Sequence, residues 1–181
     1  MLSSPRVMLE PSVFSDRWNT EVVASHPDVE DFRLHQAPSS IATAPILAST
    51  ADFLTQAGLP DGCAPFLSFR AVAAGAVPLP EYYGLPSTGH LAQFRVIGSD
   101  GAGNPLCIDT TADDIVVRLD HEDRFATTQF VASSVSSLAE ALLLLHTVPR
   151  EAFLPALRQC DSRAAHPDAF LPREFAMLND A

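Results

Sequence analysis

The segment from residue 91 to residue 120 constrains the fold most, because short apolar runs alternate there with turn residues. The runs occupy residues 91–98, 106–108 and 115–120. Runs of this kind between turn signals are typical of β-strands. The link at residues 99–104 reads Ser-Asp-Gly-Ala-Gly-Asn, which supplies the positive φ angles of a tight turn, and residues 110–114 turn the chain again. The sequence therefore predicts an antiparallel meander over about residues 91–120.

Helices are predicted on both sides of this meander along the chain. Residues 49–60 have Ser49 or Thr50 as a cap at the start and Gly58 followed by Pro60 at the end. Residues 134–147 carry leucines at helical spacing after a cap at Ser133 or Ser134, and Ser137 with Glu140 fits a capping box. Two further short helices are predicted at residues 149–159 and 167–178.

The other segments give weaker signals. Five prolines punctuate residues 1–48, so this N-terminal arm is expected to be irregular and to contain no long helix. Trp18, the only tryptophan, is expected to pack on the core as an anchor. Strands are predicted at residues 65–70 and 128–131. A loop rich in small residues, with Tyr82 and Tyr83 in it, is predicted at residues 71–90.

Charge and composition exclude several classes of function. The 181 residues contain 22 acids and 11 bases, for a net charge of −11, and every base is an arginine. Binding to nucleic acid or to an anionic membrane needs clustered basic residues. Without lysine, Schiff-base chemistry and a P-loop phosphate clamp are impossible. With no visible signal peptide, no apolar run long enough to span a bilayer and only three cysteines, we expect a cytoplasmic protein.

No motif in the sequence indicates catalysis or a metal. The six histidines show no ligand spacing, and neither HExxH nor GxSxG occurs. The glycine-rich loop at residues 99–104 precedes a strand, whereas a phosphate cradle precedes a helix. His121 lies among acids, but neighbouring strand residues point to opposite faces and cannot converge on one ion. We therefore expect no catalytic residues, no metal, no cofactor and no small-molecule substrate.

The acids themselves are the best candidates for a binding site. Residues 100–123 contain seven acids and a single base, Arg118, and so carry a net charge of −6. One interpretation is a solvated rim of the meander; the other is a patch that steers a basic partner. The two tyrosines could either contact that partner or only pack the loop on the sheet. The candidate partner-binding residues are Tyr82, Tyr83, Asp100, Asp113, Asp114, Asp120, Glu122 and Asp123.

Five segments in a fixed order resemble the SUKH superfamily, in particular its fourth subgroup of bacterial immunity proteins. They are Phe53-Leu54-x-x-x-Gly58-Leu59-Pro60, Pro65-Phe66-Leu67-Ser68-Phe69, the run from Val96 to Asp109, Val116-x-x-Leu119-Asp120-His121-Glu122 and Phe130-Val131-x-Ser133-Ser134-Val135-x-x-Leu138-Ala139. The region of Trp18 and the tail at residues 168–171 are also similar, so that the resemblance covers about residues 15–175. Leu171 departs from the usual Trp, and Asn19 from the commoner Gly.

The resemblance implies an α+β fold with a mixed, mostly antiparallel sheet and helices packed on one face. The meander and the helices predicted from the residues agree with it. It further implies one domain over residues 1–181, with a core at 49–147 between the arm and the C-terminal helices at 149–178. Members of the family are cytoplasmic binding proteins without cofactors, and no catalytic residues belong to it. Many neutralise a toxin domain, often a nuclease or a nucleic-acid deaminase.

The sequence leaves three functions open. The first is an immunity protein that binds a cognate, basic toxin domain. The second is a scaffold or regulatory module without a toxin partner, which the sequence does not separate from the first. The third is a small enzyme, which would require a deep pocket with a convergent His or Cys and acids of perturbed pKa.

Overall fold

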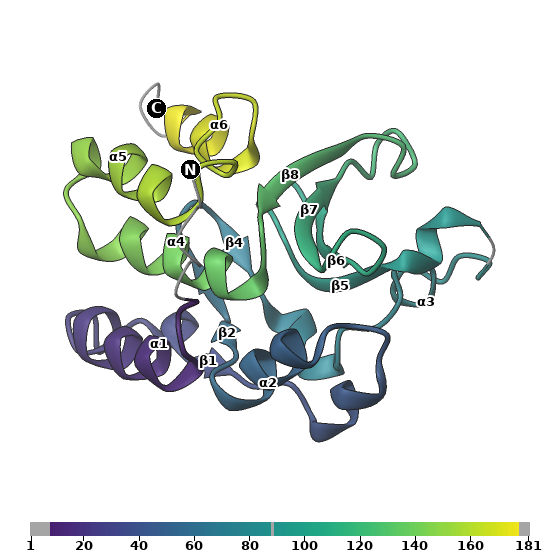
Figure 1. Ribbon diagram of the computed structural model, residues 1–181, viewed down its shortest axis with the longest axis horizontal. Helices are drawn as coiled ribbons and strands as arrows, with labels where there is room; N and C mark the ends of the chain where they lie inside the picture. Colours follow the sequence, from purple (N-terminus) through teal and green to yellow (C-terminus); the bar gives the residue numbers. More distant parts are fainter. Residues whose placement is uncertain (1–7, 88, 178–181) are drawn as a thin grey trace, which may run out of the picture.

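Six strands in consecutive order form the main sheet of the structure, a computed structural model that describes residues 8–87 and 89–177 (Figure 1). The strands are β3 (Gly62–Cys63), β4 (Leu67–Ser68), β5 (Phe94–Ser99), β6 (Pro105–Asp109), β7 (Ile115–Leu119) and β8 (Thr128–Ala132). The predicted meander is confirmed as β5–β7. All pairings among the described strands are antiparallel, so the expectation of a mixed sheet is wrong for the part of the chain that the structure describes.

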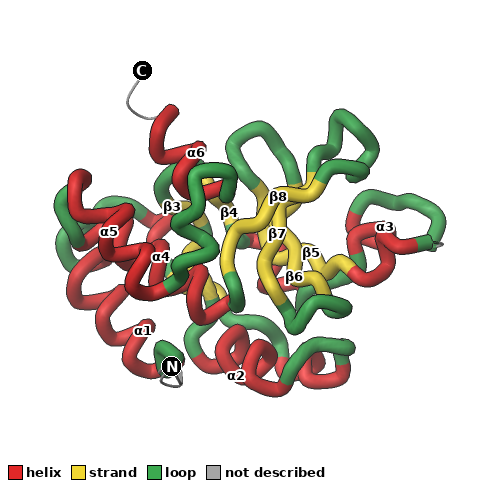
Figure 2. Tube along the Cα trace, turned by 45° about the horizontal axis from the view of Figure 1, so that its top comes forward, coloured by secondary structure: helices red, strands yellow, loops and turns green. Residues whose placement is uncertain are grey.

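One face of this sheet shares a core with the large helices. These are α1 (Pro11–Arg17), α2 (Ala48–Gln56), α4 (Val135–Thr147), α5 (Arg150–Cys160) and α6 (Phe170–Met177) (Figures 1 and 2). Ile108 and Val131 of the sheet belong to the same buried cluster as Leu138 and Leu142 of α4. This arrangement confirms the predicted α+β class, because burying the apolar face of an antiparallel sheet under helices is what stabilises such a fold.

The opposite face of the sheet has a smaller core of its own, which we call the second core. Alternate residues of the strands point away from the helices, because side chains along a strand alternate between the two faces. Those on this face include Val96, Cys107 and Val117, which pack with Leu79 and Phe125. Leu79 lies on the short helix α3 (Leu79–Tyr82), and Phe125 lies in the link between β7 and β8. A helix therefore covers part of this second face too, inside the segment predicted as a loop.

Residues 11–23 of the N-terminal arm are helical, which corrects the prediction of an irregular arm for this segment. Helix α1 continues directly into a π-helical turn, Trp18–Val23. Pro11 occupies the first position of α1, where no backbone N–H is needed. Further along, 3₁₀ turns at Glu30–Phe32 and Ser39–Thr43 flank β1 (Leu34–His35), which pairs with β2 (Leu59–Pro60). Residues 1–7 of the arm lie outside the described residues.

Trp18 is an anchor, as predicted. Its side chain is fully buried, and its Nε1–H donates to the carbonyl oxygen of Phe32 at 2.7 Å. Its ring lies 5.7 Å from the Phe14 ring and 5.3 Å from the His146 ring. The arm is therefore fastened to α4 by an aromatic cluster whose single indole donor is satisfied.

The predicted cap of α2 and the predicted capping box in α4 need correction. Leu47, and neither Ser49 nor Thr50, is the N-cap of α2, and its backbone N–H donates to the carboxylate of Asp114 at 2.6 Å. Helix α4 starts at the predicted Ser134, whose hydroxyl accepts from the backbone N–H of Ser137. The expected capping box at Ser137 is therefore wrong, since the cap lies one turn earlier.

Most other segment ends agree with the sequence. Helix α2 stops before Gly58, whose φ is 73° and where a Cβ would lie 2.1 Å from the His35 carbonyl oxygen. Helices α5 and α6 match the two predicted C-terminal helices, although residue 178 lies outside the described residues. The strand predicted at 65–70 is reduced to β4, because Phe66 has a φ of 72° and residues 70–74 form a 3₁₀ turn.

We expect the aromatic cluster to make stability depend on pH through His146. Its Nε2 atom is buried and has no hydrogen-bond partner among the described residues. Burial, with a smaller contribution from His26, lowers the pKa of His146 below its ordinary value of 6.5. Because the unfolded chain then binds the proton more readily, the free energy of unfolding should fall as pH falls through 6.5. Urea unfolding between about pH 7.5 and pH 5.5 measures this effect.

The matched variant is His146→Phe, which keeps an aromatic ring in the cluster and removes the titrating group. Its free energy of unfolding should change less over the same pH interval than that of the parent protein. Parallel pH profiles for the two proteins would show that His146 is not the source of the acid sensitivity.

Candidate protein-binding surface

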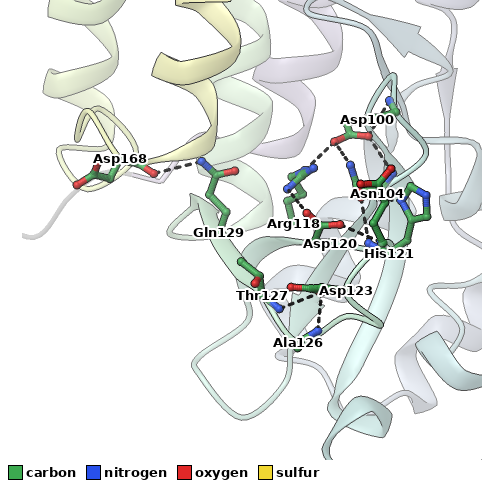
Figure 3. Close-up of polar contacts among 12 residues, drawn as sticks. Asp100, Asn104, Arg118, Asp120, His121, Asp123, Ala126, Thr127, Gln129 and Asp168 are labelled. Carbon is green, nitrogen blue, oxygen red and sulfur yellow. Dashed lines mark hydrogen bonds and ion pairs between the residues drawn. The ribbon is translucent and has the colours of Figure 1, made fainter.

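Asp100 organises the hairpin between β5 and β6 (Figure 3). Its Oδ1 accepts the backbone N–H groups of Ala102 and Asn104 at 2.9 and 2.8 Å, which closes the turn. Its Oδ2 accepts Nδ2 of Asn104 at 2.9 Å and Nε of Arg118 at 2.7 Å. Burial alone would raise the pKa of Asp100, but the hydrogen bonds from Arg118 and Asn104 outweigh it and hold that pKa below its usual range.

Asn104 joins this hairpin to the link between β7 and β8. Its side-chain oxygen accepts the backbone N–H of His121 at 3.0 Å and contacts Nδ1 of the same histidine at 2.7 Å. Since the Asn104 amide nitrogen donates to Asp100, its oxygen is the acceptor, and Nδ1 of His121 carries the proton. Arg118 also lies 4.0 Å from Asp120. The two loops therefore form one polar framework at this end of the sheet.

The β7–β8 link, residues 120–127, is shaped by its own carboxylates. Asp120 accepts the backbone N–H of Glu122 at 2.9 Å, and Asp123 accepts that of Ala126 at 2.9 Å. These bonds turn the link so that Phe125 is buried in the second core. Glu122 is left exposed, and its carboxylate has no hydrogen bond or ion pair among the described residues. Glu122 is thus the acid of this loop that is free to meet a partner.

The two tyrosines have different surroundings. The Tyr83 ring packs 5.0 Å from the Phe125 ring, and its hydroxyl donates to the carbonyl oxygen of Gly103 at 3.4 Å. Burial, with smaller contributions from neighbouring groups, raises the pKa of Tyr83 to about 12. Tyr82 is 49% exposed beside it. Tyr83 therefore packs α3 on the sheet, and Tyr82 presents the larger aromatic surface to solvent.

Two of the predicted acids do not lie on an exposed rim, which corrects the expectation for Asp100 and Asp114. Asp100 is 8% exposed, and Asp114 is 2% exposed because it caps α2. Asp113 is exposed, but it lies in the turn that precedes β7. The five residues of β7 span about 17 Å, so Asp113 lies at the opposite end of the strand from Asp120. The predicted patch is therefore divided between two ends of the sheet.

We define the loop-end surface as the 99–104 hairpin, the 120–127 link and α3. It brings together Tyr82, Tyr83, Asp100, Asp120, Glu122 and Asp123, and it leaves out Asp113 and Asp114. Sequence reasoning missed one conspicuous neighbour of this surface. Phe66 is 72% exposed and adjoins Gly101 of the hairpin. The sequence signal at Phe66 was that of an ordinary strand residue.

The described residues contain no group of three or more His, Cys, Asp or Glu that could hold a metal ion. All three cysteines are buried, and burial raises the pKa of the Cys63 and Cys107 thiols, which opposes a thiolate nucleophile at those two positions. No helix within residues 8–87 and 89–177 is long and apolar enough to cross a membrane.

One family model matches most of the chain. The model of the family described as SUKH-4 immunity protein matches residues 30–166, a range that contains both sheets and α2–α5. Trp18 and α6 lie outside the matched range. No curated protein and no solved structure matches the chain. Because the matched range is more than half of the 181 residues, the chain belongs to the SUKH-4 immunity protein family.

Proposed function

We propose that this protein is an immunity protein that binds a cognate toxin domain and neutralises it by protein–protein contact. Membership of the SUKH-4 immunity protein family carries this proposal. It acts without a cofactor, a nucleic-acid ligand or catalysis of its own, and it works in the cytoplasm. The loop-end surface is the proposed docking face, because it combines exposed acids and Tyr82 with a framework of hydrogen bonds that holds the loops in place before binding.

The charge supports a basic toxin domain. The chain carries a net charge of −11, and nucleases and nucleic-acid deaminases present basic surfaces to their substrates. An acidic protein surface can occupy the same groove and is drawn toward it by long-range attraction. We therefore propose that the toxin is a nuclease or a nucleic-acid deaminase.

The test is growth rescue. Cells would express the toxin-like C-terminal domain encoded beside this protein, with and without this protein, and surviving colonies would be counted. Rescue together with co-purification of a stable complex would support the proposal. If the toxin is active and this protein is folded, failure to rescue would favour a scaffold or regulatory module without a toxin partner.

We expect charge reversal at Glu122 to slow association with the toxin domain about three- to tenfold at low salt, since steering depends on exposed charge near the interface. Surface plasmon resonance on the full-length Glu122→Lys variant measures the association rate. The difference should shrink in about 0.5 M salt because ions screen the exposed charge.

Two exposed acids serve as comparisons for Glu122→Lys. Glu151→Lys on α5 makes the same change in net charge away from the loops and should alter the association rate less than about twofold. Asp113→Lys shows whether the other end of β7 takes part, and we expect it to behave like Glu151→Lys. An unchanged rate for Glu122→Lys would remove the 120–127 link from the interface.

A further inference from the structure

We infer that the groove between Phe66, the 99–104 hairpin and α6 receives an arginine or lysine side chain of the toxin domain, with Phe66 as the apolar anchor beside it. This inference rests on the proposed function and names the chemistry of the partner at one place on it. Phe66 and the hairpin connect this groove to the loop-end surface, which supplies the exposed acids.

The exposure and the backbone conformation of Phe66 are the first observation. Phe66 is 72% exposed, and its backbone has a φ of 72°, a region that bulky residues rarely adopt. Folding therefore places this residue at an unfavourable backbone conformation and leaves its large apolar side chain in water, so neither packing nor backbone preference accounts for it. An exposed aromatic on a constrained backbone is well suited to anchor a protein–protein interface.

The groove beside Phe66 is the second observation. It has a volume of about 530 Å³, and its walls include Phe66, Ala102 and Met177. Met177, in the last turn of α6, is 64% exposed. Asp100, Arg118 and Glu174 also line the groove. It thus offers apolar walls for the carbon chain of a long side chain and charged groups for its head.

The charges that line the groove favour a positively charged side chain as its occupant. Arg118, the only basic residue among the described residues that line the groove, already donates to Asp100 at 2.7 Å and lies 4.0 Å from Asp120. The carboxylate of Glu174 has no hydrogen bond or ion pair among the described residues. Burial, and then the charge of Asp100, raises the pKa of Glu174, and Arg118 compensates only in part. One negative charge in the groove therefore lacks a matching cation.

An arginine or lysine meets both requirements at once. Its aliphatic stem can lie against Phe66 and Met177, and its charged head can pair with Glu174. A guanidinium can also stack on the Phe66 ring. An acidic side chain would add to the negative charge, and an apolar one would bury Glu174 further without compensation.

The experiment measures the dissociation constant between full-length protein and the toxin domain encoded beside it, by isothermal titration calorimetry. Phe66→Asn removes the ring and keeps a residue that tolerates positive φ. Glu174→Gln removes the charge with little change in shape. The matched controls are Val13→Asn, which changes an exposed apolar residue on α1, and Glu151→Gln. Circular dichroism and thermal melting establish that each variant is folded.

We expect Phe66→Asn to weaken binding about 30-fold and Glu174→Gln about tenfold, with both controls within about twofold of the parent. Glu174→Gln should also make binding less sensitive to salt. Should the parent bind while both groove variants bind equally well, the inference is wrong and the proposed function stands. Tighter binding by Glu174→Gln would likewise overturn a basic occupant. Should the parent itself not bind, the proposed function fails, and the inference fails with it.

Discussion

Replacing Trp18 by alanine is expected to lower the free energy of unfolding by about 4 kcal/mol, the range observed for removing a buried Trp or Phe side chain. The indole is fully buried. It packs against Phe14 at 5.7 Å and against His146 of α4 at 5.3 Å. The variant would leave a cavity between the N-terminal helix and α4 and would deprive the Phe32 carbonyl of its donor.

Urea unfolding followed by far-ultraviolet circular dichroism measures this loss, since the variant has no tryptophan to report by fluorescence. Trp18→Phe keeps a ring but loses the hydrogen bond and part of the volume, and it should cost about 2 kcal/mol. Val13→Ala, an exposed site on the same helix, should change stability by less than about 0.5 kcal/mol. A loss below about 1 kcal/mol for Trp18→Ala would contradict the anchoring role.

Asp161→Ala is expected to lower the free energy of unfolding by about 3 kcal/mol, because it leaves three donors, one buried and two partly buried, without an acceptor. Asp161 is 2% exposed, at the end of α5. Its carboxylate accepts the backbone N–H and the hydroxyl of Ser133 at 2.7 and 2.9 Å, and the backbone N–H of Ala164 at 3.1 Å. It therefore joins the chain between β8 and α4 to the segment that follows α5.

The comparison variant for Asp161 is Asp168→Ala, which removes an aspartate whose side chain is 77% exposed. We expect that change to alter the free energy of unfolding by less than about 0.5 kcal/mol, since exposed ion pairs contribute little. The two variants differ in the burial of the carboxylate and in the donors that depend on it. Equal unfolding midpoints in urea for Asp161→Ala and Asp168→Ala would show that the Ser133 contacts do not stabilise the fold.

The meander and the apolar helix α4 were predictable because their signals are local. Short turns between apolar runs force neighbouring strands to pair antiparallel, and the spacing of leucines with a cap at Ser134 defines α4. The helix at residues 11–23 was not predictable from proline content alone, since prolines in a segment usually indicate that no helix forms there. Pro11 instead occupies the first turn, where proline is tolerated, and packing of Phe14 and Trp18 stabilises the helix.

For the candidate surface, the sequence located the acids but not their environments. Asp100, Asp114 and Glu122 look alike in the sequence, as acids near turns of one acidic segment. In the fold, Asp100 is held by Arg118, Asp114 caps a helix 67 residues away along the chain, and Glu122 stays in solvent. The sequence did not indicate that Phe66 is exposed. Whether an apolar residue in a short strand-like run is buried depends on which other residues pack beside it.

The sequence by itself determined the positions of α2, α4, α5 and α6, the antiparallel meander, the net negative charge and the family resemblance. These properties depend on residue type and on spacings of a few residues, where backbone preferences and hydrophobic period act. The tertiary structure alone decided which carboxylates are buried, which aromatic is exposed and which loops meet. Those outcomes depend on contacts between residues far apart in the chain, such as Asp114 with Leu47 and Phe66 with the 99–104 hairpin, and only the packed fold brings such residues together.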